Sequence, residues 1–494
     1  MAQHKVQLLA NEGIFKGLAK QNMLFHQCLA ELIDNAIAAK KTDEKFRVDV
    51  ILIPDNAGES VIDLYVADNC KGMDLPTLGR ALQLGESATH ESRLNEHGFG
   101  LKNSLATLSG GNAKWKIWTR PMPHKQTCSV EGPFRSEMLI HDDDVLPTDD
   151  FLPADISTVI KVRVKLSFLQ TVQGRGAPTK DLVNLREWLI EHLGVLYRGY
   201  LEQDSQTLEN TGVIVVSIAN DRLQVPPIAV PLGNKKTEYP EVEVAGKVVK
   251  LEYHHGTLDD VKRDKLVRGN KAKYYYQGNI PTQGIDIRLG RRTIATRQFE
   301  TIWKTEDGKD QLSRHNNYND FTGELIIPEL PRGVLTTTNN KSDFNLEDSD
   351  WAKIFSKLNE FRPVKNVRER SEADLRKKWL KMLKATNPDE IITDERSVWP
   401  TAARIDVYRE TSDGKIIIYE LKVGSGAPIH LYQLKMYWDG LVIEKVQPKE
   451  GILLVEDFST SLEEMANKMN QLTPPVDSKP YNFKIEKLKD KGLL

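Results

Sequence analysis

Cysteine is scarce in this chain of 494 residues, which has only Cys28, Cys70 and Cys128. None of them has the paired spacing of a zinc motif or a disulfide framework, so we expect neither. Long apolar runs are missing too, because no stretch approaches the roughly 18 to 20 consecutive apolar residues that span a bilayer. The first residues, MAQHKVQLLANEGIFKG, lack the apolar core of a secretion signal. We therefore expect a cytoplasmic protein with no membrane partner.

An excess of positive charge is also absent, since 68 Lys and Arg residues stand against 70 Asp and Glu residues. This balance gives no overall signature of nucleic-acid binding. Basic residues nevertheless gather locally, and phosphate neutralisation supplies most non-specific affinity for DNA. Any DNA contact should come from such segments, although a charged run is as often only a solvated surface. The segments are VKRDKLVRGNKAKYYYQ (261–277), RLGRRTIATR (288–297) and RERSEADLRKKWLKMLK (368–384).

The length exceeds what one hydrophobic core usually organises, so roughly two to four domains are expected. Apolar spacing predicts a helix over 22–40, and strand-like runs follow at 46–54, 61–68 and 157–166. These elements, with a glycine-rich loop among them, indicate an α+β layer rather than repeated βαβ units. A second α+β domain fills the middle third. The last unit is predicted to have a helix over 371–384, a loop over 387–403, strands over 404–410 and 416–423 joined by a turn, and a helix over 430–442.

Two polar residues, Glu31 and Asn35, lie four positions apart and hence on one face of the first predicted helix. Their neighbours are apolar, so the helix should be mostly buried, and buried polar groups need partners. A carboxylate can deprotonate a water, and an amide oxygen can bind Mg²⁺. Asp68 ends a strand and can accept the exocyclic amine of adenine. The sequence GFGLK (98–102) opens a helix whose N-terminus favours phosphate, although a glycine doublet alone is also typical of an ordinary turn.

The order ELIDNAIAA, DNCKGM, HGFGLKNS and STVI resembles the GHKL ATPase superfamily and, within it, the MORC branch. The resemblance implies a Bergerat-fold α/β sandwich that binds ATP with Mg²⁺. It makes Glu31 the base that activates water and Asn35 the Mg²⁺ ligand. Cys70 stands where the family usually has glycine, which costs ~1 kcal/mol or more only if the backbone φ there is positive. The nucleotide-binding residues that it implies are Asp68, Gly72, Met73, Gly98, Gly100, Leu101, Lys102 and Thr158.

The segment TTTNNKSDF (336–344) resembles the N-K-x-D-F element of the MORC-type transducer, an S5-like domain. The resemblance suggests that Lys341 reaches the γ-phosphate, where an ammonium would stabilise charge in the transition state. A lysine in a surface loop is the alternative. The resemblance also implies an ATP-dependent homodimer that closes as a clamp, which rests on analogy.

Three residues of the hairpin predicted near the C-terminus have the pattern of a metal site. Asp406 lies near the start of one strand, Glu420 near the end of the next, and Lys422 on the same face as Glu420. Two carboxylates can bind Mg²⁺ or Mn²⁺, and a neighbouring lysine can orient a water, which suits phosphodiester hydrolysis. The pattern resembles the PD-(D/E)xK nuclease superfamily, which implies a restriction-endonuclease-like α/β domain. A surface salt bridge between Glu420 and Lys422 is the alternative.

Supporting residues flank this pattern on both sides. Gln433 and Tyr437, four positions apart in the following helix, match the Q-x-x-x-Y element of the RecB-like branch of that superfamily. The superfamily often adds an acid on an upstream helix, for which Glu372 is the candidate and Asp374 the substitute.

These interpretations divide the chain into an ATPase domain (1–167), a transducer domain (168–360) and a nuclease-like domain (361–494). We expect an ATP-gated enzyme that binds and cuts DNA. Its association of domains resembles prokaryotic restriction or anti-phage systems, in which a second defence protein is a further candidate partner. The alternative is an ATP-dependent DNA-binding clamp whose nuclease-like domain grips DNA without cutting it.

Overall fold

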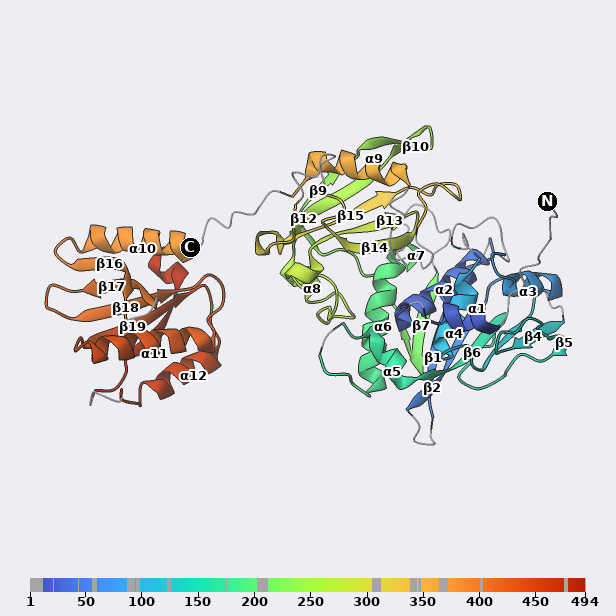
Figure 1. Cartoon of the computed structure of the whole chain (residues 1–494), viewed down its shortest axis with the longest axis horizontal. Helices are drawn as coiled ribbons and strands as arrows, with labels where there is room; N and C mark the ends of the chain where they lie inside the picture. Colours follow the sequence, from blue (N-terminus) through green and yellow to red (C-terminus); the bar gives the residue numbers. More distant parts are fainter. Residues whose placement is uncertain are drawn as a thin grey trace, which may run out of the picture. The chain divides into compact units, whose positions relative to one another are not determined.

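A computed structural model describes residues 12–20, 22–42, 44–55, 60–86, 94, 98–121, 126–174, 176–201, 212–303, 312–337, 344, 348–363, 372–399, 403–474 and 479–493. The chain forms two compact units, residues 1–364 and 365–494 (Figure 1). Each unit has hydrophobic cores of its own.

The first unit contains a mixed eight-stranded sheet in the order β5-β4-β3-β6-β2-β1-β7-β8. β1 pairs antiparallel with β2 and parallel with β7, so a strand from much later in the chain extends the sheet. Runs such as VIDLYVAD and VIVVSI are rich in β-branched residues, which favours buried strands. The strands are β1 (Arg47–Pro54), β2 (Val61–Asp68), β3 (Trp115–Thr119), β4 (Thr127–Glu131), β5 (Ile140–Asp144), β6 (Thr158–Lys165), β7 (Val213–Ile218) and β8 (Asp221–Gln224).

Helices cover one face of this sheet, and the opposite face carries a smaller apolar cluster under the 151–156 segment (Figure 1). α2, α4 and α6 share one core with the strands, and α2 is buried along most of its length. A helix that is apolar nearly all round belongs in a core, which is how the sequence places α2 at the centre of the layer. The helices are α1 (Glu12–Leu18), α2 (Phe25–Ala38), α3 (Leu75–Leu82), α4 (Gly100–Leu108), α5 (Leu166–Leu169), α6 (Leu182–Leu196) and α7 (Arg198–Leu201).

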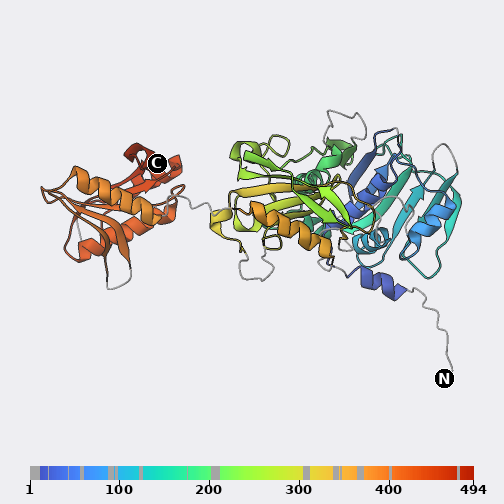
Figure 2. The ribbon, with the colours of Figure 1, turned by 90° about the horizontal axis from the view of Figure 1, so that it is seen from above.

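A second sheet of the first unit has five strands in the order β14-β13-β15-β12-β9. α9 packs Trp351, Ile354 and Phe355 into the core of this sheet, and Figure 2 shows the helix lying along it. The elements are β9 (Leu232–Glu238), the hairpin β10 (Glu241–Val244) and β11 (Lys247–Lys250), β12 (Glu252–Leu258), α8 (Asp260–Arg263), β13 (Gly284–Leu289), β14 (Arg292–Gln298), β15 (Phe321–Ile327) and α9 (Ser349–Leu358).

The second unit is a three-layer α/β structure around the sheet β16-β17-β18-β19-β20. α10 covers one face, and α11 and α12 cover the other (Figure 1). Tyr408 and Ile418 enter one core and their chain neighbours Val407 and Tyr419 enter the other, as the alternation of a strand requires. The elements are α10 (Glu372–Thr386), β16 (Ile391–Ser397), β17 (Arg404–Glu410), β18 (Ile416–Leu421), α11 (Pro428–Ile443), β19 (Pro448–Val455), α12 (Thr460–Met469) and β20 (Phe483–Lys487).

The expected α+β multidomain architecture is confirmed, with mixed sheets in both units. The predicted hairpin is confirmed as well, because β17 and β18 pair antiparallel across the turn at 411–415. The prediction of a loop over 387–403 is wrong, since β16 occupies part of it and pairs with β17. β16 is an edge strand of which only Ile392 is buried, so its charged residues hide the usual apolar alternation.

Candidate functional site

One candidate site lies where α2 meets the start of α4. Glu31 of α2 is 3% exposed, and its carboxylate faces Gly100, the first residue of α4. A Cβ at position 100 would lie 2.0 Å from Glu31 Oε2, so only glycine leaves room for this carboxylate. The first N–H groups of a helix carry partial positive charge and attract phosphate oxygens. The site therefore brings a proton acceptor next to backbone donors suited to an anion.

Asn35 follows one turn later on α2. Its amide nitrogen is buried and has no hydrogen-bond partner within the described part of the chain. An asparagine amide offers either an oxygen acceptor or an NH₂ donor, and its oxygen is a ligand that Mg²⁺ accepts. The atom without a partner is the nitrogen, which is a donor, so a ligand-borne cation would have to be bound by the amide oxygen of Asn35.

Asp68, at the end of β2, is the centre of a second buried polar group. Its Oδ1 accepts hydrogen bonds from the backbone N–H of Cys70 at 2.9 Å and from the Ser157 hydroxyl at 3.2 Å. Burial raises the pKa of the Asp68 carboxyl to about 6, and these hydrogen bonds oppose the rise. Thr158 lies beside Asp68 in the β2–β6 register, and its hydroxyl is 3.1 Å from that of Thr119. This corner of the sheet can accept a donor such as an amine.

The glycine-rich segments around these groups approach other backbone closely. Gly72 has φ +67°, and a Cβ there would lie 2.1 Å from Arg120 O. Gly98 has φ +65°, with a Cβ position 2.7 Å from Glu86 O. Both positions therefore require glycine. Cys70, in contrast, is not among the described residues with positive φ, so its replacement of the usual glycine carries no backbone strain.

Lys102 lies on α4 and is only 1% exposed. Its Nζ donates to the carbonyl of Ala81 at 3.0 Å and of Glu86 at 3.4 Å. Burial lowers the pKa of Lys102 to about 8, because few charges compensate the lost hydration. Leu101 is half-buried in the same turn, and Met73 donates its backbone N–H to Thr119 Oγ1 at 2.8 Å. A partly neutralised ammonium in this place would regain its full charge beside a phosphate.

Lys341 lies outside the described residues, as do the residues 87–93 and 95–97 that precede the glycine-rich loop. Their roles remain the predictions made from the sequence.

The sequence interpretation missed Asp34, which lies between Glu31 and Asn35 and is fully buried. Its Oδ1 accepts hydrogen bonds from Tyr197 Oη at 2.8 Å and from Arg292 Nε of β14 at 3.0 Å. The Arg292 guanidinium also stacks on the Tyr197 ring at 4.5 Å. An acid within an otherwise apolar helix was the available signal, but its partner is 258 residues away in sequence. This ion pair joins the helix of Glu31 to the second sheet.

The second unit holds a separate cluster at one end of the β17–β18 hairpin. Val407 pairs with Tyr419, so Asp406 and Glu420 face each other one position further along. The backbone N–H of Leu421 donates to Asp406 Oδ2 at 2.8 Å. Burial and then the charge of Asp406 raise the pKa of Glu420 to about 7, and burial raises that of Asp406 as well. The two carboxylates repel each other in a buried place, which favours a bound proton or cation.

Lys422 joins this cluster from the end of β18. Its Nζ is 3.0 Å from Glu420 Oε1 and 2.9 Å from Glu372 Oε2 at the start of α10. Burial lowers the pKa of Lys422, but both carboxylates raise it more strongly, so the ammonium keeps its charge. Of the two candidate upstream acids, Glu372 lies at the cluster through its contact with Lys422, and both Glu372 and Asp374 are exposed.

α11 closes the cluster from the other face. Tyr437 is 7% exposed, and burial followed by the charges of Glu420 and Asp406 raises its pKa. The side-chain oxygen of Gln433 is buried without a partner among the described residues. Sequence interpretation missed Arg376 of α10, whose guanidinium is 3.6 Å from Asp406.

The carboxylates of this cluster suit a divalent cation in their number and burial. Glu420 is 1% exposed, and its Oε2 is buried without a hydrogen-bond partner in the described part of the chain. Within the described residues, no group of three or more His, Cys, Asp or Glu side chains is placed to hold a metal ion. Mg²⁺ usually takes only one or two carboxylates and completes its shell with water and substrate oxygens, so Asp406 and Glu420 fit it.

Comparison with known families gives one match. Residues 23–138 match the family described as "Histidine kinase-, DNA gyrase B-, and HSP90-like ATPase". The matched segment contains α2, the Asp68 strand end and the Gly98–Lys102 turn. The first unit therefore contains a GHKL-type ATPase domain, a class that binds and hydrolyses ATP, typically with Mg²⁺, and often dimerises.

No curated protein matches the chain. Over its described residues, no helix is both long and apolar enough to cross a membrane.

Proposed function

We propose that this protein is an ATP-hydrolysing, ATP-gated DNA-processing nuclease of the MORC-like branch, acting in prokaryotic restriction or anti-phage defence. The family match supports ATP binding and hydrolysis by the first unit. The nuclease part rests on one observation, the convergence of Asp406, Glu420 and Lys422 at one end of a hairpin. The defence role follows from the association of these two domain types alone.

In the ATPase reaction, Glu31 accepts a proton from the attacking water. Its carboxylate is placed for this in the space that Gly100 leaves at the start of α4. Asp68 accepts the adenine amine, with Thr158 beside it. Lys102 moves from the carbonyls of Ala81 and Glu86 to the phosphates. Gly98 and Gly100 would hold the phosphates, and a Mg²⁺ ion held by Asn35 and the phosphates would neutralise phosphate charge.

The finer division of the chain belongs to the same proposal. Residues 1–167 form a Bergerat-fold ATPase domain, residues 168–360 an S5-like transducer, and residues 361–494 a PD-(D/E)xK-type nuclease. β7 and β8, from residues 213–224, continue the first sheet, so the ATPase and transducer are closely joined. Lys341 acts at the γ-phosphate, and ATP closes a homodimer. A second defence protein is a further partner.

In DNA cleavage, Lys422 orients a water, and its ammonium balances the charge gathered near Asp406 and Glu420. Glu372 holds Lys422 in place from α10. Tyr437 and Gln433 position the carboxylates from α11. A divalent cation on Asp406 and Glu420, Mg²⁺ or Mn²⁺, would polarise the scissile phosphate. Leu421 fixes the orientation of Asp406 through its backbone N–H.

The test is a plasmid-cleavage assay with ATP and Mg²⁺ or Mn²⁺, run beside a phosphate-release assay. We expect Asp406→Asn and Lys422→Ala to lose cleavage but keep ATP turnover. We expect Glu31→Gln to lose turnover but keep ATP binding. Full cleavage by Asp406→Asn would show that the nuclease site is wrong. DNA binding without any cleavage by the unmodified protein would favour the alternative, an ATP-dependent clamp.

A further inference from the structure

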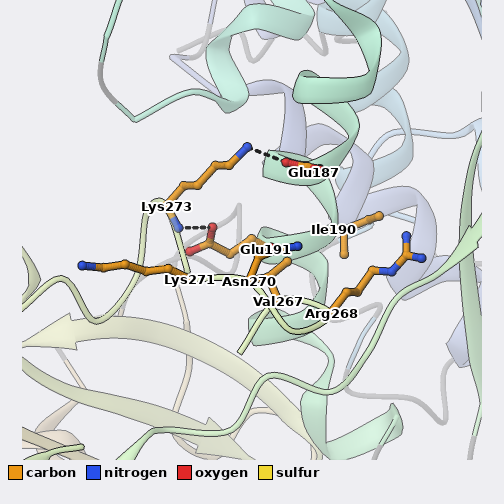
Figure 3. A pocket seen from close by; sticks show the side chains of 8 residues that line it. All are labelled: Glu187, Ile190, Glu191, Val267, Arg268, Asn270, Lys271 and Lys273. Atoms are coloured by element: carbon orange, nitrogen blue, oxygen red, sulfur yellow. Dashed lines mark hydrogen bonds and ion pairs between the residues drawn. The ribbon is translucent and has the colours of Figure 1, made fainter. Parts of the chain in front are cut away.

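A pocket of about 240 Å³ lies between α6 and the 267–273 loop of the first unit, and none of its lining residues belongs to the sites described above. Figure 3 shows its lining: Glu187, Ile190, Glu191, Val267, Arg268, Asn270, Lys271 and Lys273. The loop belongs to the 262–273 segment, which has six basic residues and one acidic residue. The segment is therefore strongly basic in a chain whose overall charge is close to zero.

The two acids of the pocket hold the loop in place. Glu191 is 1% exposed, and its carboxylate accepts the backbone N–H groups of Lys273 at 2.7 Å, Tyr274 at 2.9 Å and Tyr275 at 2.8 Å. The Glu187 carboxylate forms an ion pair with the Lys273 ammonium at 2.5 Å, which Figure 3 draws as a dashed line. Both carboxylates are thus already engaged, and they fix the backbone that presents the remaining cations.

Three cations of the segment are left over. Lys265, Arg268 and Lys271 are exposed, and their side chains have no hydrogen-bond or ion-pair partner within the described part of the chain. Arg268 and Lys271 extend in opposite directions from the loop in Figure 3. The turn itself is closed by the Val267–Asn270 bridge, with Arg268 at φ +53° and Gly269 at φ +86°. Fixed backbone lowers the entropy that these side chains lose on binding a partner.

The neighbouring basic segment, 288–297, is used differently. Arg292 is buried in its pair with Asp34, Arg288 is 3.5 Å from Glu324, and Arg297 donates to Tyr274 Oη at 3.1 Å. These arginines hold the protein together, whereas the cations of the 265–271 loop face solvent. Of the two basic segments, the loop is thus the one whose cations a partner can reach.

We infer that Lys265, Arg268 and Lys271 form a contact surface for the phosphate backbone of DNA, beside the pocket of α6. This rests on the proposed function, because DNA is the polyanion on which a nuclease acts. Val267 and Ala272 are buried and Leu266 is partly buried against the core, so residues 265–272 present no exposed large apolar side chain to insert into a lipid surface. Separate cations on a fixed turn match the spaced charges of a nucleic-acid backbone, and they specify no base sequence.

The experiment is binding of a labelled DNA duplex and single strand to the full chain, followed by fluorescence anisotropy in EDTA without nucleotide. The variant is the triple substitution Lys265→Gln, Arg268→Gln and Lys271→Gln. At about 50 mM salt we expect it to bind at least ~30-fold more weakly than the unmodified protein. Between about 50 and 200 mM salt, the slope of log affinity against log salt should flatten by about 2 to 3, because each lost phosphate contact removes about 0.9.

A matched control removes the same number of positive charges at other positions of the first unit. Lys114, Arg135 and Lys247 are exposed, so the triple change of these to Gln alters two lysines and one arginine as before. We expect it to bind within about threefold of the unmodified protein, since distant exposed charges are screened. An equal loss of DNA affinity in both triple variants would show that only net charge matters, and it would overturn the inference. An unchanged affinity and slope in the loop variant would overturn it too.

Failure of the inference is distinct from failure of the nuclease. Cleavage by Asp406→Asn would remove the proposed nuclease site but leave DNA binding by the loop intact. Absence of DNA binding by the unmodified protein, duplex and single strand alike, would overturn the DNA contact. Both ATP turnover and thermal stability should be unchanged in the loop variant, because its three side chains contact nothing in the ATPase site.

Discussion

Asp68→Asn should stabilise the nucleotide-free protein while abolishing ATP binding. The side chain is buried, and burial raises its pKa from 3.8 to about 6. Asparagine keeps an oxygen that accepts from the Cys70 N–H and the Ser157 hydroxyl, which now hold Asp68 Oδ1. It removes the buried charge and turns an NH₂ group toward the place where adenine would present its own amine. The substitution therefore separates folding from recognition.

The size of the stabilisation follows from the pKa shift. The pKa of Asp68 is higher in the folded state than in the unfolded state. At a pH between these two pKa values the folded protein binds more protons, so its free energy of unfolding falls as the pH rises and the buried carboxyl ionises. A shift of roughly two units corresponds to about 3 kcal/mol at pH 7 and about half of that at pH 5. The gain in free energy of unfolding of the Asn variant over the unmodified protein should accordingly be larger at pH 7 than at pH 5. The unpaired NH₂ group of the asparagine reduces this gain at both pH values.

The assay is urea unfolding of both proteins at pH 5 and pH 7, followed through the transition of the first unit and repeated with ATP. ATP at a hundred times its dissociation constant should stabilise the unmodified protein by about 2.7 kcal/mol and the variant not at all. If the stability of the variant relative to the unmodified protein were lower at pH 7 than at pH 5, the assignment of Asp68 as a buried carboxylate that costs stability when ionised would be refuted. ATP protection of the variant would refute its role toward adenine.

Three further outcomes are expected. Gly100→Ala should displace the Glu31 carboxylate and lower ATP turnover about a hundredfold, whereas Gly79→Ala, whose Cβ meets nothing within 4 Å, should leave turnover unchanged in a phosphate-release assay. The pKa of Glu420 is raised to about 7, so a proton competes with Mn²⁺ for this carboxylate at lower pH. The Mn²⁺ affinity of the nucleotide-free protein, measured by calorimetry, should therefore rise up to tenfold per pH unit between pH 5.5 and 6.5 and level off above pH 7.5. A flat profile would contradict a proton shared by the cluster. Arg292→Met should destabilise the first unit by about 3 to 5 kcal/mol in urea unfolding, because it leaves the buried carboxylate of Asp34 without its partner. An unchanged free energy of unfolding would show that the ion pair is dispensable.

The sequence was sufficient where local patterns carry the information. α2 and the β17–β18 hairpin have strong periodicity, and the residue spacing alone placed Glu31 beside Asn35 and Asp406 opposite Glu420. It was insufficient for β16, because an edge strand with one buried residue has almost no apolar alternation to detect.

Contacts between distant segments were out of reach for another reason. Spacing along a helix shows which residues share a face but not which strand arrives there. Asp34 was passed over because its partner, Arg292, comes from β14, and Arg376 because its neighbour Asp406 lies on another element. The free cations of the 265–271 loop were visible as charges, but only the ion pairs of Lys262, Arg263 and Lys273 in the structure separate them from the paired ones.

α2 serves two purposes at once, and this limits how ATP can act on the first unit. Glu31 faces Gly100 on α4, while Asp34, less than one turn further, is paired with Arg292 on the second sheet. Both side chains of that pair are nearly inaccessible to water, so separating them would expose two unpaired charges in a buried place, at a cost of several kcal/mol. A nucleotide that shifted α2 against β14 would have to supply that energy. We therefore expect α2 and β14 to move together, and an ATP-driven change in the first unit to occur at elements that are not fixed to this pair.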